Sequence, residues 1–214
     1  MVVTSHGAIE EGHPTGIWLE EFAVPFELFS AAGHRITVAS PRGGKAPLDP
    51  RSTADAAKDY QPDTLLALED TLDLDGLDLS GFDAVFFPGG HGTMFDLPGD
   101  DRVSSIASYF IASDKPSAFV CHGPAALVNA TLPDGTSVVA GRKVTGFTNA
   151  EEDAVELTEK MPFLLESKLK ELGAQFAGAD NFVEHIVTDG NLITGQNPAS
   201  SKAAALALLE QLNR

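Results

Sequence analysis

Apolar residues recur along the chain with two spacings, and these spacings predict alternating helices and strands. In residues 16–32, Trp18, Phe22, Phe26 and Phe29 lie three or four positions apart, which is the apolar stripe of an amphipathic helix. Further helices are predicted at residues 53–59 (a single turn), 63–70, 101–113, 123–130, 149–159, 163–172 and 197–212. Short apolar runs between turn-forming residues predict strands at residues 2–4, 34–39, 84–87, 116–120, 137–139, 143–147, 184–188 and 191–194.

This order of elements predicts an α/β fold. Strands that alternate with helices form a mostly parallel central sheet flanked by helices on both faces. The last two strands are expected to form a hairpin across Asp189-Gly190. The chain has no internal repeat, low-complexity tract or linker, so we expect a single domain over residues 1–214, with the irregular stretches as insertions near the edge of the sheet.

Composition narrows the cellular setting. One cysteine excludes an internal disulfide and favours a reducing compartment. The longest apolar run, residues 203–209, is too short to cross a bilayer, so no membrane association is predicted. The first residues lack the basic region and the long apolar region of a signal peptide. We therefore expect a cytoplasmic protein.

The net charge excludes one class of partner. The chain has 14 basic and 31 acidic residues, for a formal net charge of −17. Such a chain repels phosphate backbones, and no cluster of lysine and arginine interrupts the acidity. No nucleic-acid partner is predicted, and solubility accounts for most of the carboxylates.

The single cysteine, Cys121, stands where an apolar run meets small residues, in the segment SAFVCHGPAA at residues 117–126. This pattern predicts a strand, a sharp turn and a helix, which is the construction of a nucleophile elbow. The N-terminus of the following helix favours a negative charge, such as a thiolate. His122 follows directly, where a base or an orienting group belongs. The alternative is an inert buried thiol.

A glycine-rich turn follows the predicted strand at residues 84–87. Its sequence, PGGHG, lets backbone N–H groups approach a ligand closely. Ligand sites of open α/β sheets lie at the carboxyl ends of strands, where this turn and Cys121 are both expected. We predict an oxyanion hole formed by the backbone amides of Gly90 and His122. The alternative is a turn without a catalytic role.

Two acidic residues interrupt the apolar pattern of the first helix. Glu20 and Glu21 are adjacent and therefore point about 100° apart on a helix. A glutamate that faces inward beside Cys121 would have its pKa raised by burial and could shuttle a proton. The alternative for either residue is a solvated surface acid.

The histidines indicate no metal centre. They show neither metal-ligand spacing nor an HExxH motif, so no metal ion is predicted. The six positions are His6, His13, His34, His91, His122 and His185.

Five segments in order resemble one family, and together they span nearly the whole chain. The chain is similar to the ThiJ/PfpI superfamily, which shares a flavodoxin-like fold with class I glutamine amidotransferases. More narrowly, it resembles the heat-shock-protein-like branch described as glutathione-independent glyoxalase, or glyoxalase III. The segments that carry the resemblance are residues 16–26, 88–96, 120–125, 145–152 and 194–200.

The resemblance assigns roles to the acidic residues. Relatives have a glutamate before Ala-x-Pro in the first helix, with one residue between, which is Glu21 rather than Glu20 here. They also have an acidic residue that orients the histidine a few positions after Gly-Phe-Thr. Counting along this chain gives Glu152, with Glu151 as the alternative. Asn149 departs from the aspartate common in relatives, and the first strand of relatives extends further upstream.

The activity that the resemblance implies is the conversion of methylglyoxal or a related 2-oxoaldehyde to a 2-hydroxy acid such as lactate. Cys121 would form a hemithioacetal with the aldehyde, and no cofactor would be needed because oxidation at C1 is balanced by reduction at C2. His91, Phe147 and Trp18 are the predicted substrate-binding residues, with core packing or solvent exposure as the alternative for each. Relatives are often dimers, so a homodimer is expected.

Two other functions remain open from the sequence. The same cysteine, histidine and glutamate suit a hydrolase or hydratase of the superfamily. A stress chaperone or a redox sensor is the non-enzymatic alternative, because a cysteine beside an acid can be oxidised to sulfinate. A histidine together with an acid partner favours catalysis, since a sensor needs only the thiol and one acid.

Overall fold

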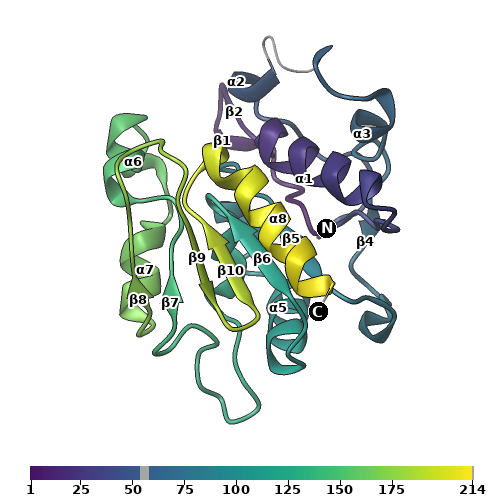
Figure 1. The fold of residues 1–214 in the computed structure, drawn as a ribbon. Helices are drawn as coiled ribbons and strands as arrows, with labels where there is room; N and C mark the ends of the chain where they lie inside the picture. The colour runs from purple at the N-terminus through teal and green to yellow at the C-terminus, as the bar shows by residue number, and fades with distance from the viewer. Residues whose placement is uncertain (54–57, 214) are drawn as a thin grey trace.

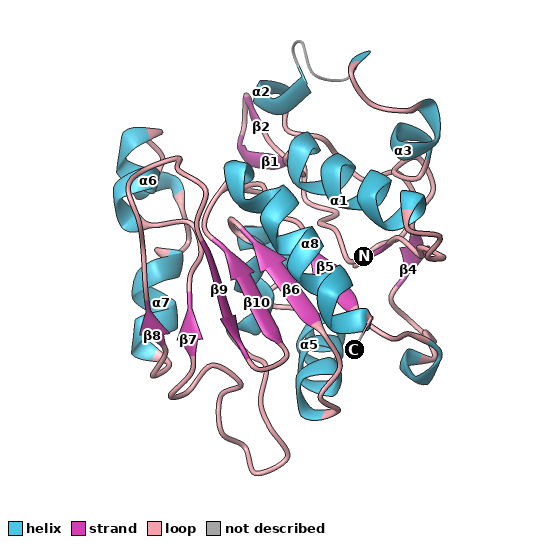
Figure 2. Ribbon diagram, in the orientation of Figure 1, coloured by secondary structure: helices cyan, strands magenta, loops and turns pink. Residues whose placement is uncertain are grey.

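The computed structural model describes residues 1–53 and 58–213, and its centre is a four-stranded sheet. The strands run in the order β5-β6-β10-β9, with β5, β6 and β10 parallel and β9 antiparallel to β10. Figure 2 shows β6 and β10 side by side in the middle of this sheet. Their bounds are β5 Val85–Phe87, β6 Ser117–Val120, β9 Ile186–Asp189 and β10 Leu192–Gly195.

The first residues of the chain extend this sheet beyond β5. The Val2 N–H donates to the Phe86 carbonyl at 3.0 Å, and the Val3 N–H donates to the Ala39 carbonyl at 2.9 Å. Residues 2–3 therefore lie between β5 and β3 (Ala39–Ser40), parallel to β3. Without the edge strands β4 (Leu72–Asp73) and β9, the strands across the sheet, numbered in chain order, are second, first, third, fourth and fifth. This is the flavodoxin-like order, so the predicted fold class is confirmed.

The remaining strands are short. β1 and β2 form an antiparallel hairpin, while β3 pairs with β4 and β7 pairs with β8 in parallel. The sequence did not predict β1, β2, β4 or β8, because each has only two or three residues and no apolar alternation. Their bounds are β1 Ala8–Glu10, β2 His13–Pro14, β3 Ala39–Ser40, β4 Leu72–Asp73, β7 Lys143–Val144 and β8 Gln175–Phe176.

Helices cover both faces of the sheet. α1 and α8 pack against each other on one face, and α5 lies on the other (Figure 1). No helix among the described residues is both long and apolar enough to span a bilayer. The α-helices are α1 Leu19–Ala31, α2 Pro50–Thr53, α3 Pro62–Leu66, α4 Thr93–Asp96, α5 Asp101–Ala112, α6 Asn149–Ala154, α7 Leu165–Glu171 and α8 Ser201–Leu212. The 3-10 helices that lie wholly within the described residues include η2 Leu79–Gly81, η3 Gly123–Leu127, η4 Thr158–Lys160 and η5 Pro198–Ser200.

The core lies on both faces of the sheet because adjacent strand residues point in opposite directions. Phe86 contacts Phe29 of α1, with ring centroids 5.6 Å apart. The next residue, Phe87, faces the α5 side and stacks on Phe119 at 4.8 Å. Strand β5 is therefore apolar throughout, as expected of a parallel strand covered on both faces.

Several predicted strands are wrong in whole or in part, including residues 143–147, of which only Lys143 and Val144 form a strand. Residues 137–139 form a turn, in which only Ser137 makes a bridge, because Val138 and Val139 enter the core without strand pairing. Within residues 34–39, only Ala39 belongs to a strand, since its neighbours in the sheet are themselves short.

Several predicted helices are shorter than expected. The helix predicted at residues 123–130 is the five-residue 3-10 helix η3, so little dipole is available to stabilise a charge on Cys121. Residues 149–159 divide into α6 and η4. The turn predicted at residues 53–59 overlaps residues 54–57, which lie outside the described part of the chain.

Candidate active site

The candidate site begins at a backbone bend after β6. Cys121 has a φ of +58°, a left-handed conformation that non-glycine residues rarely adopt. Hydrogen bonds on both sides of the bend hold it: the Cys121 N–H donates to the Gly195 carbonyl, and its carbonyl accepts from the Phe147 N–H, each at 2.9 Å. Strained backbone of this kind costs on the order of 1–3 kcal/mol and persists where the surrounding structure enforces it.

His122 links this bend to a carboxylate. Its Nδ1 atom lies 3.3 Å from the Cys121 Sγ atom, and its Nε2 atom lies 2.8 Å from Glu152 Oε2. His122 is fully buried. Burial alone would raise the pKa of Glu152, but the charges and hydrogen bonds of His122 and His91 outweigh it and lower the pKa. Glu152 is therefore a carboxylate beside two imidazoles.

The structure separates the two glutamates that the sequence left as alternatives. Glu151 closes a capping box at the start of α6, where its Oε2 atom accepts from the Thr148 N–H at 3.0 Å. Its Oε1 atom accepts from the Phe182 N–H at 2.8 Å and from Asn197 Nδ2 at 2.9 Å. Glu151 therefore holds α6 and the loop at Phe182, whereas Glu152 is the residue that contacts His122.

Glu21 lies fully buried in the first turn of α1. Its Oε2 atom accepts from the Gly89 N–H at 2.7 Å, and the Trp18 N–H donates to the Gly89 carbonyl at 3.2 Å. The Oε1 atom has no N–H or O–H partner among the described residues, and the carboxyl group lies beside the Cys121 thiol. Burial raises the pKa of Glu21 to about 8, while the adjacent Glu20 is only partly buried.

The thiol differs from the thiolate that the sequence predicted. Burial raises the pKa of Cys121 well above its usual value, and the neighbouring Glu21 raises it further. The backbone N–H of His122 opposes this shift without reversing it. Two buried acids side by side retain their protons because neither charge is solvated. Deprotonation of Cys121 therefore requires a base, and His122 Nδ1 is in position to accept the proton.

His91 belongs to the same hydrogen-bonded group. Its Nε2 atom lies 2.9 Å from Glu152 Oε1, and its ring centroid lies 4.2 Å from that of His122. The Arg51 Nη2 atom lies 3.1 Å from His91 Nδ1. Burial, followed by the nearby His122, lowers the pKa of His91 to about 4. The sequence placed His91 at the substrate, whereas here it is bound to Glu152.

His91, His122 and Glu152 also form a group that could hold a metal ion. One ligand atom from each residue lies within 4.8 Å of the others, and all three side chains are buried. Successive members of this group are 30 or more positions apart in the chain, so sequence spacing could not reveal the group.

The two amides predicted to form an oxyanion hole have no oxygen acceptor among the described residues. Neither the Gly90 N–H nor the His122 N–H donates to an oxygen atom of the described residues. Gly90 has a φ of +100°, and a Cβ atom there would overlap the carbonyl of Gly16. Glycine is therefore required at this turn.

Aromatic side chains surround the imidazoles. The ring of Phe147 lies 4.4 Å from that of His122, and the half-exposed Phe182 lies 6.3 Å from Phe147. Trp18 is partly buried, with the Arg51 guanidinium 6.0 Å from its ring centroid. Sequence reasoning missed Arg51 and Phe182, since each lies in a stretch without a recognisable pattern.

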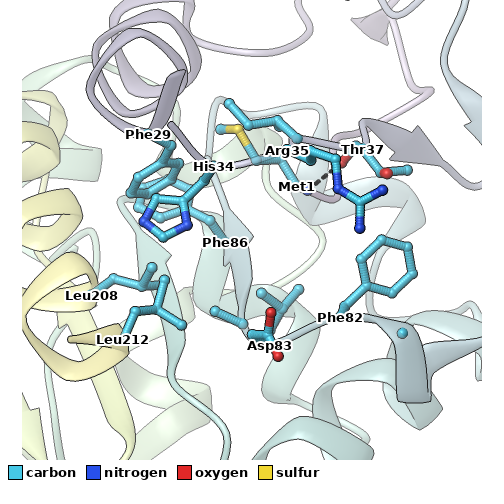
Figure 3. A pocket seen from close by; sticks show the side chains of 14 residues that line it. Met1, Phe29, His34, Arg35, Thr37, Phe82, Asp83, Phe86, Leu208 and Leu212 are labelled. Carbon is cyan, nitrogen blue, oxygen red and sulfur yellow. Dashed lines mark hydrogen bonds between the residues drawn. The ribbon is translucent and has the colours of Figure 1, made fainter. Parts of the chain in front are cut away.

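A hollow of about 480 Å³ lies apart from this site, at the amino end of β5 (Figure 3). It is lined by residues that include Phe29, Phe86 and Leu208, and by none of the residues around Cys121. The ends of β5 therefore differ: the carboxyl end carries the candidate site, and the amino end carries this separate hollow.

Fold and site together define a flavodoxin-like α/β protein with a cysteine, a histidine and buried glutamates at the carboxyl edge of its sheet. The sequence profile of the DJ-1/PfpI family matches residues 15–211. The chain belongs to the DJ-1/PfpI family.

Individual relatives match most of the chain. The glutathione-independent glyoxalase hsp3101 of Schizosaccharomyces pombe is 31% identical, over 94% of this chain and 88% of that protein. The crystal structure of glyoxalase III from Candida albicans superposes with a TM-score of 0.89 at 28% identity, over 98% of this chain and 94% of that one. The crystal structure of APC35852 has a TM-score of 0.96 at 47% identity, over 100% and 96% of the two chains.

Proposed function

We propose that this protein is a glutathione-independent glyoxalase that converts methylglyoxal or a related 2-oxoaldehyde to a 2-hydroxy acid. The observation that carries the proposal is the chain of contacts from Glu152 through His122 to the Cys121 thiol, with the buried Glu21 beside the same thiol. This arrangement supplies a nucleophile, its base and a separate proton carrier. The glyoxalases named among the relatives support this reading.

The first step is addition of the thiol to the aldehyde. The Cys121 Sγ atom attacks C1, a sulfur–carbon bond forms, and the carbonyl electron pair moves to oxygen. His122 Nδ1, 3.3 Å from Sγ, accepts the thiol proton. Glu152 stabilises the resulting imidazolium, and the amides of Gly90 and His122 bind the oxyanion. The product of this step is a hemithioacetal.

The second step moves a proton from C1 to C2. The Glu21 carboxylate removes the C1 proton, the electron pair forms a C1–C2 double bond, and the C2 carbonyl pair moves to its oxygen, which takes the proton of the His122 imidazolium, so that an enediolate results. Glu21 then returns the proton to C2, the C1 carbonyl forms again, and a thioester remains. A pKa of about 8 suits both halves of this shuttle, because acid and base forms are both accessible near neutral pH.

The third step is hydrolysis. Water adds to the thioester carbonyl as His122 takes one of its protons, the carbon–sulfur bond breaks, and the sulfur recovers this proton from the His122 imidazolium. The sum of the steps is methylglyoxal plus water giving lactate. C1 is oxidised and C2 is reduced by the same electron pair, so the balance needs no external oxidant or reductant.

The test uses purified protein and methylglyoxal in buffer without glutathione, with lactate measured as the product. Catalytic lactate formation that is absent in Cys121→Ala supports the proposal. Stoichiometric loss of aldehyde without lactate contradicts it, because the thiol would then only trap the substrate. Folding of the variant is checked by circular dichroism, so that loss of activity is not loss of structure.

A role as a redox sensor has less support. Cys121 is 4% exposed, and burial raises the pKa of its thiol. Oxidation by peroxide proceeds through an accessible thiolate, so this thiol is expected to react slowly.

We also propose that the protein is a homodimer in the cytoplasm, as the family resemblance implies. Phe182 and Val183 are adjacent apolar residues that are 49% and 51% exposed, and a second copy would cover such a pair. Size-exclusion chromatography with light scattering gives the mass in solution. A mass near twice 22.5 kDa supports the dimer, and a mass near 22.5 kDa at tens of micromolar contradicts it.

A further inference from the structure

A continuous line of contacts leads from a partly exposed arginine to the buried thiol. Arg51 contacts His91, His91 contacts Glu152, Glu152 contacts His122, and His122 contacts Cys121, with the distances given above. We propose that Arg51 and His91 are positioning residues, which fix the protons along this line so that His122 Nδ1 is the free base that faces the thiol. The activity arm of this inference rests on the proposed glyoxalase function.

Arg51 determines which atom donates each hydrogen bond along this line of contacts. A guanidinium donates hydrogen bonds and accepts none, so His91 Nδ1 must be the acceptor. The proton of a neutral His91 therefore resides on Nε2, which donates to Glu152 Oε1. Glu152 is thereby held with its second oxygen, Oε2, toward His122 Nε2. That nitrogen carries the proton of His122, and Nδ1 is left with a lone pair toward Sγ.

The charges around His91 also favour its neutral form. Arg51 of α2 and, when protonated, His122 are the cations that face it, and Glu152 of α6 is the anion. Asp49 pairs with Arg51 through two hydrogen bonds, at 3.0 and 2.6 Å, and fixes the guanidinium in place. These cations oppose a positive charge on His91, which therefore stays neutral and donates from Nε2.

The same contact opposes a metal ion in this group. A metal bound to His91 Nε2 would require the His91 proton to move to Nδ1. That nitrogen would then face the Arg51 N–H as a second donor, with no acceptor between them. The structure favours the hydrogen-bonded arrangement over metal ligation by His91, His122 and Glu152.

The direct test is the tautomer of His91, read by long-range ¹H–¹⁵N correlation spectra of protein labelled with ¹⁵N-histidine. At pH 7, His91 is expected to be protonated on Nε2 alone, and the spectrum of His91→Gln assigns its signals. In Arg51→Met, His91 is expected to show a mixture of tautomers or to become protonated at pH 5–6. A wild-type His91 protonated on Nδ1, or a spectrum unchanged in Arg51→Met, overturns the proposal.

Arg102→Met is a matched control. Arg102 pairs with Asp100 through the same two contacts, at 3.0 and 2.6 Å and with the same two-residue offset, but it contacts none of the residues around Cys121. The imidazole spectrum of His91 is expected to be the same in this variant as in the wild type. A change of the His91 signals in Arg102→Met would show that loss of any such ion pair moves them, and it would overturn the assignment to Arg51.

Steady-state kinetics of variants distinguishes a positioning role from a role in substrate binding. Arg51→Met and His91→Phe are expected to lower kcat about tenfold or more, with KM changed less than about threefold. Arg51→Lys keeps a donor and is expected to retain kcat within about threefold of the wild type. A change confined to KM overturns the positioning role. If the wild type forms no lactate, the proposed function fails on its own, while the tautomer spectra still decide this inference.

Discussion

Two buried glutamates of this site differ because of their partners. Glu152 lies between two imidazoles, which lower its pKa despite burial. Glu21 has one backbone amide and a thiol as neighbours, so burial prevails and raises its pKa to about 8. When two environments shift the pKa values of two carboxyl groups in opposite directions, one group serves as a stabilising carboxylate and the other as a proton carrier.

The raised pKa of Glu21 predicts a pH-dependent stability. A group with a folded pKa of about 8 and an unfolded value of 4.5 binds a proton on folding. The stability that this proton uptake contributes is fully present below pH 4.5 and is lost as the pH rises through 8. Glu21→Gln cannot ionise, so its stability relative to the wild type should increase across this range by up to ~1.4 kcal/mol per pH unit. Urea unfolding at pH 5, 6, 7 and 8 measures the difference, and a difference independent of pH would contradict the raised pKa.

Glu21 also predicts the pH dependence of turnover. The carboxylate form is the one that removes the C1 proton, so kcat/KM for methylglyoxal should rise with pH and level off above about 8. Glu21→Gln should lose most of the activity while its thiol still reacts with iodoacetamide. Near-normal turnover in this variant would remove Glu21 from the shuttle.

At the scale of elements, α6 shows how neighbouring residues of one type take separate roles. Adjacent helix positions point about 100° apart. Glu151 therefore turns back to cap its own helix and bind the loop at Phe182, while Glu152 points to the imidazoles. The local element explains the division, but only the position of α6 beside the bend that holds Cys121 and His122 decides which glutamate reaches His122.

This division predicts opposite results for two conservative substitutions. Both oxygen atoms of the Glu151 carboxylate accept hydrogen bonds from N–H or O–H groups. In Glu151→Gln, the side-chain NH2 group replaces one of these oxygens and faces donors, which should destabilise the fold by about 1–3 kcal/mol. Its kcat, corrected for folded protein, should stay within about threefold of the wild type. Glu152→Gln should lower kcat about 100-fold or more. Thermal unfolding and steady-state kinetics of both variants check this, and the reverse outcome would exchange the two assignments.

At the scale of the whole molecule, the site is formed where distant segments meet. α1 brings Glu21, the end of β5 brings Gly89, the bend after β6 brings Cys121, and α6 brings Glu152. Parallel strands place their carboxyl ends at one edge, which is why these segments converge. Gly89 is one point at which these segments approach closely, because its amide binds Glu21.

The close approach predicts that Gly89→Ala disrupts the site. A Cβ atom there would lie 2.6 Å from the His122 nitrogen and 2.8 Å from Glu21 Oε2, so these groups must move apart. Displacements of this size can cost about 100-fold in rate. Gly99→Ala is the matched control, since a Cβ atom at Gly99 meets nothing within 4 Å. Equal activity of the two variants in the lactate assay would contradict the packing described here.

The sequence by itself determined the features that depend on neighbours along the chain. These are the alternation of helices and strands, the bend at Cys121 with His122 beside it, and, through the family resemblance, the choice of Glu21. Periodicity and turn residues encode local backbone conformation, so these features are readable from the chain. The short strands were not, because pairing over two residues leaves no period to detect.

Tertiary structure decided the rest of the site. Glu152 reaches His122 and His91 across 30 and 61 residues, and Arg51 reaches His91 across 40. The raised pKa of the Cys121 thiol depends on burial by segments that are remote in the chain. Ionisation and hydrogen-bond direction follow from the dielectric environment and from the partners that surround a group. Only the packing of α1, β5, β6 and α6 against one another sets those.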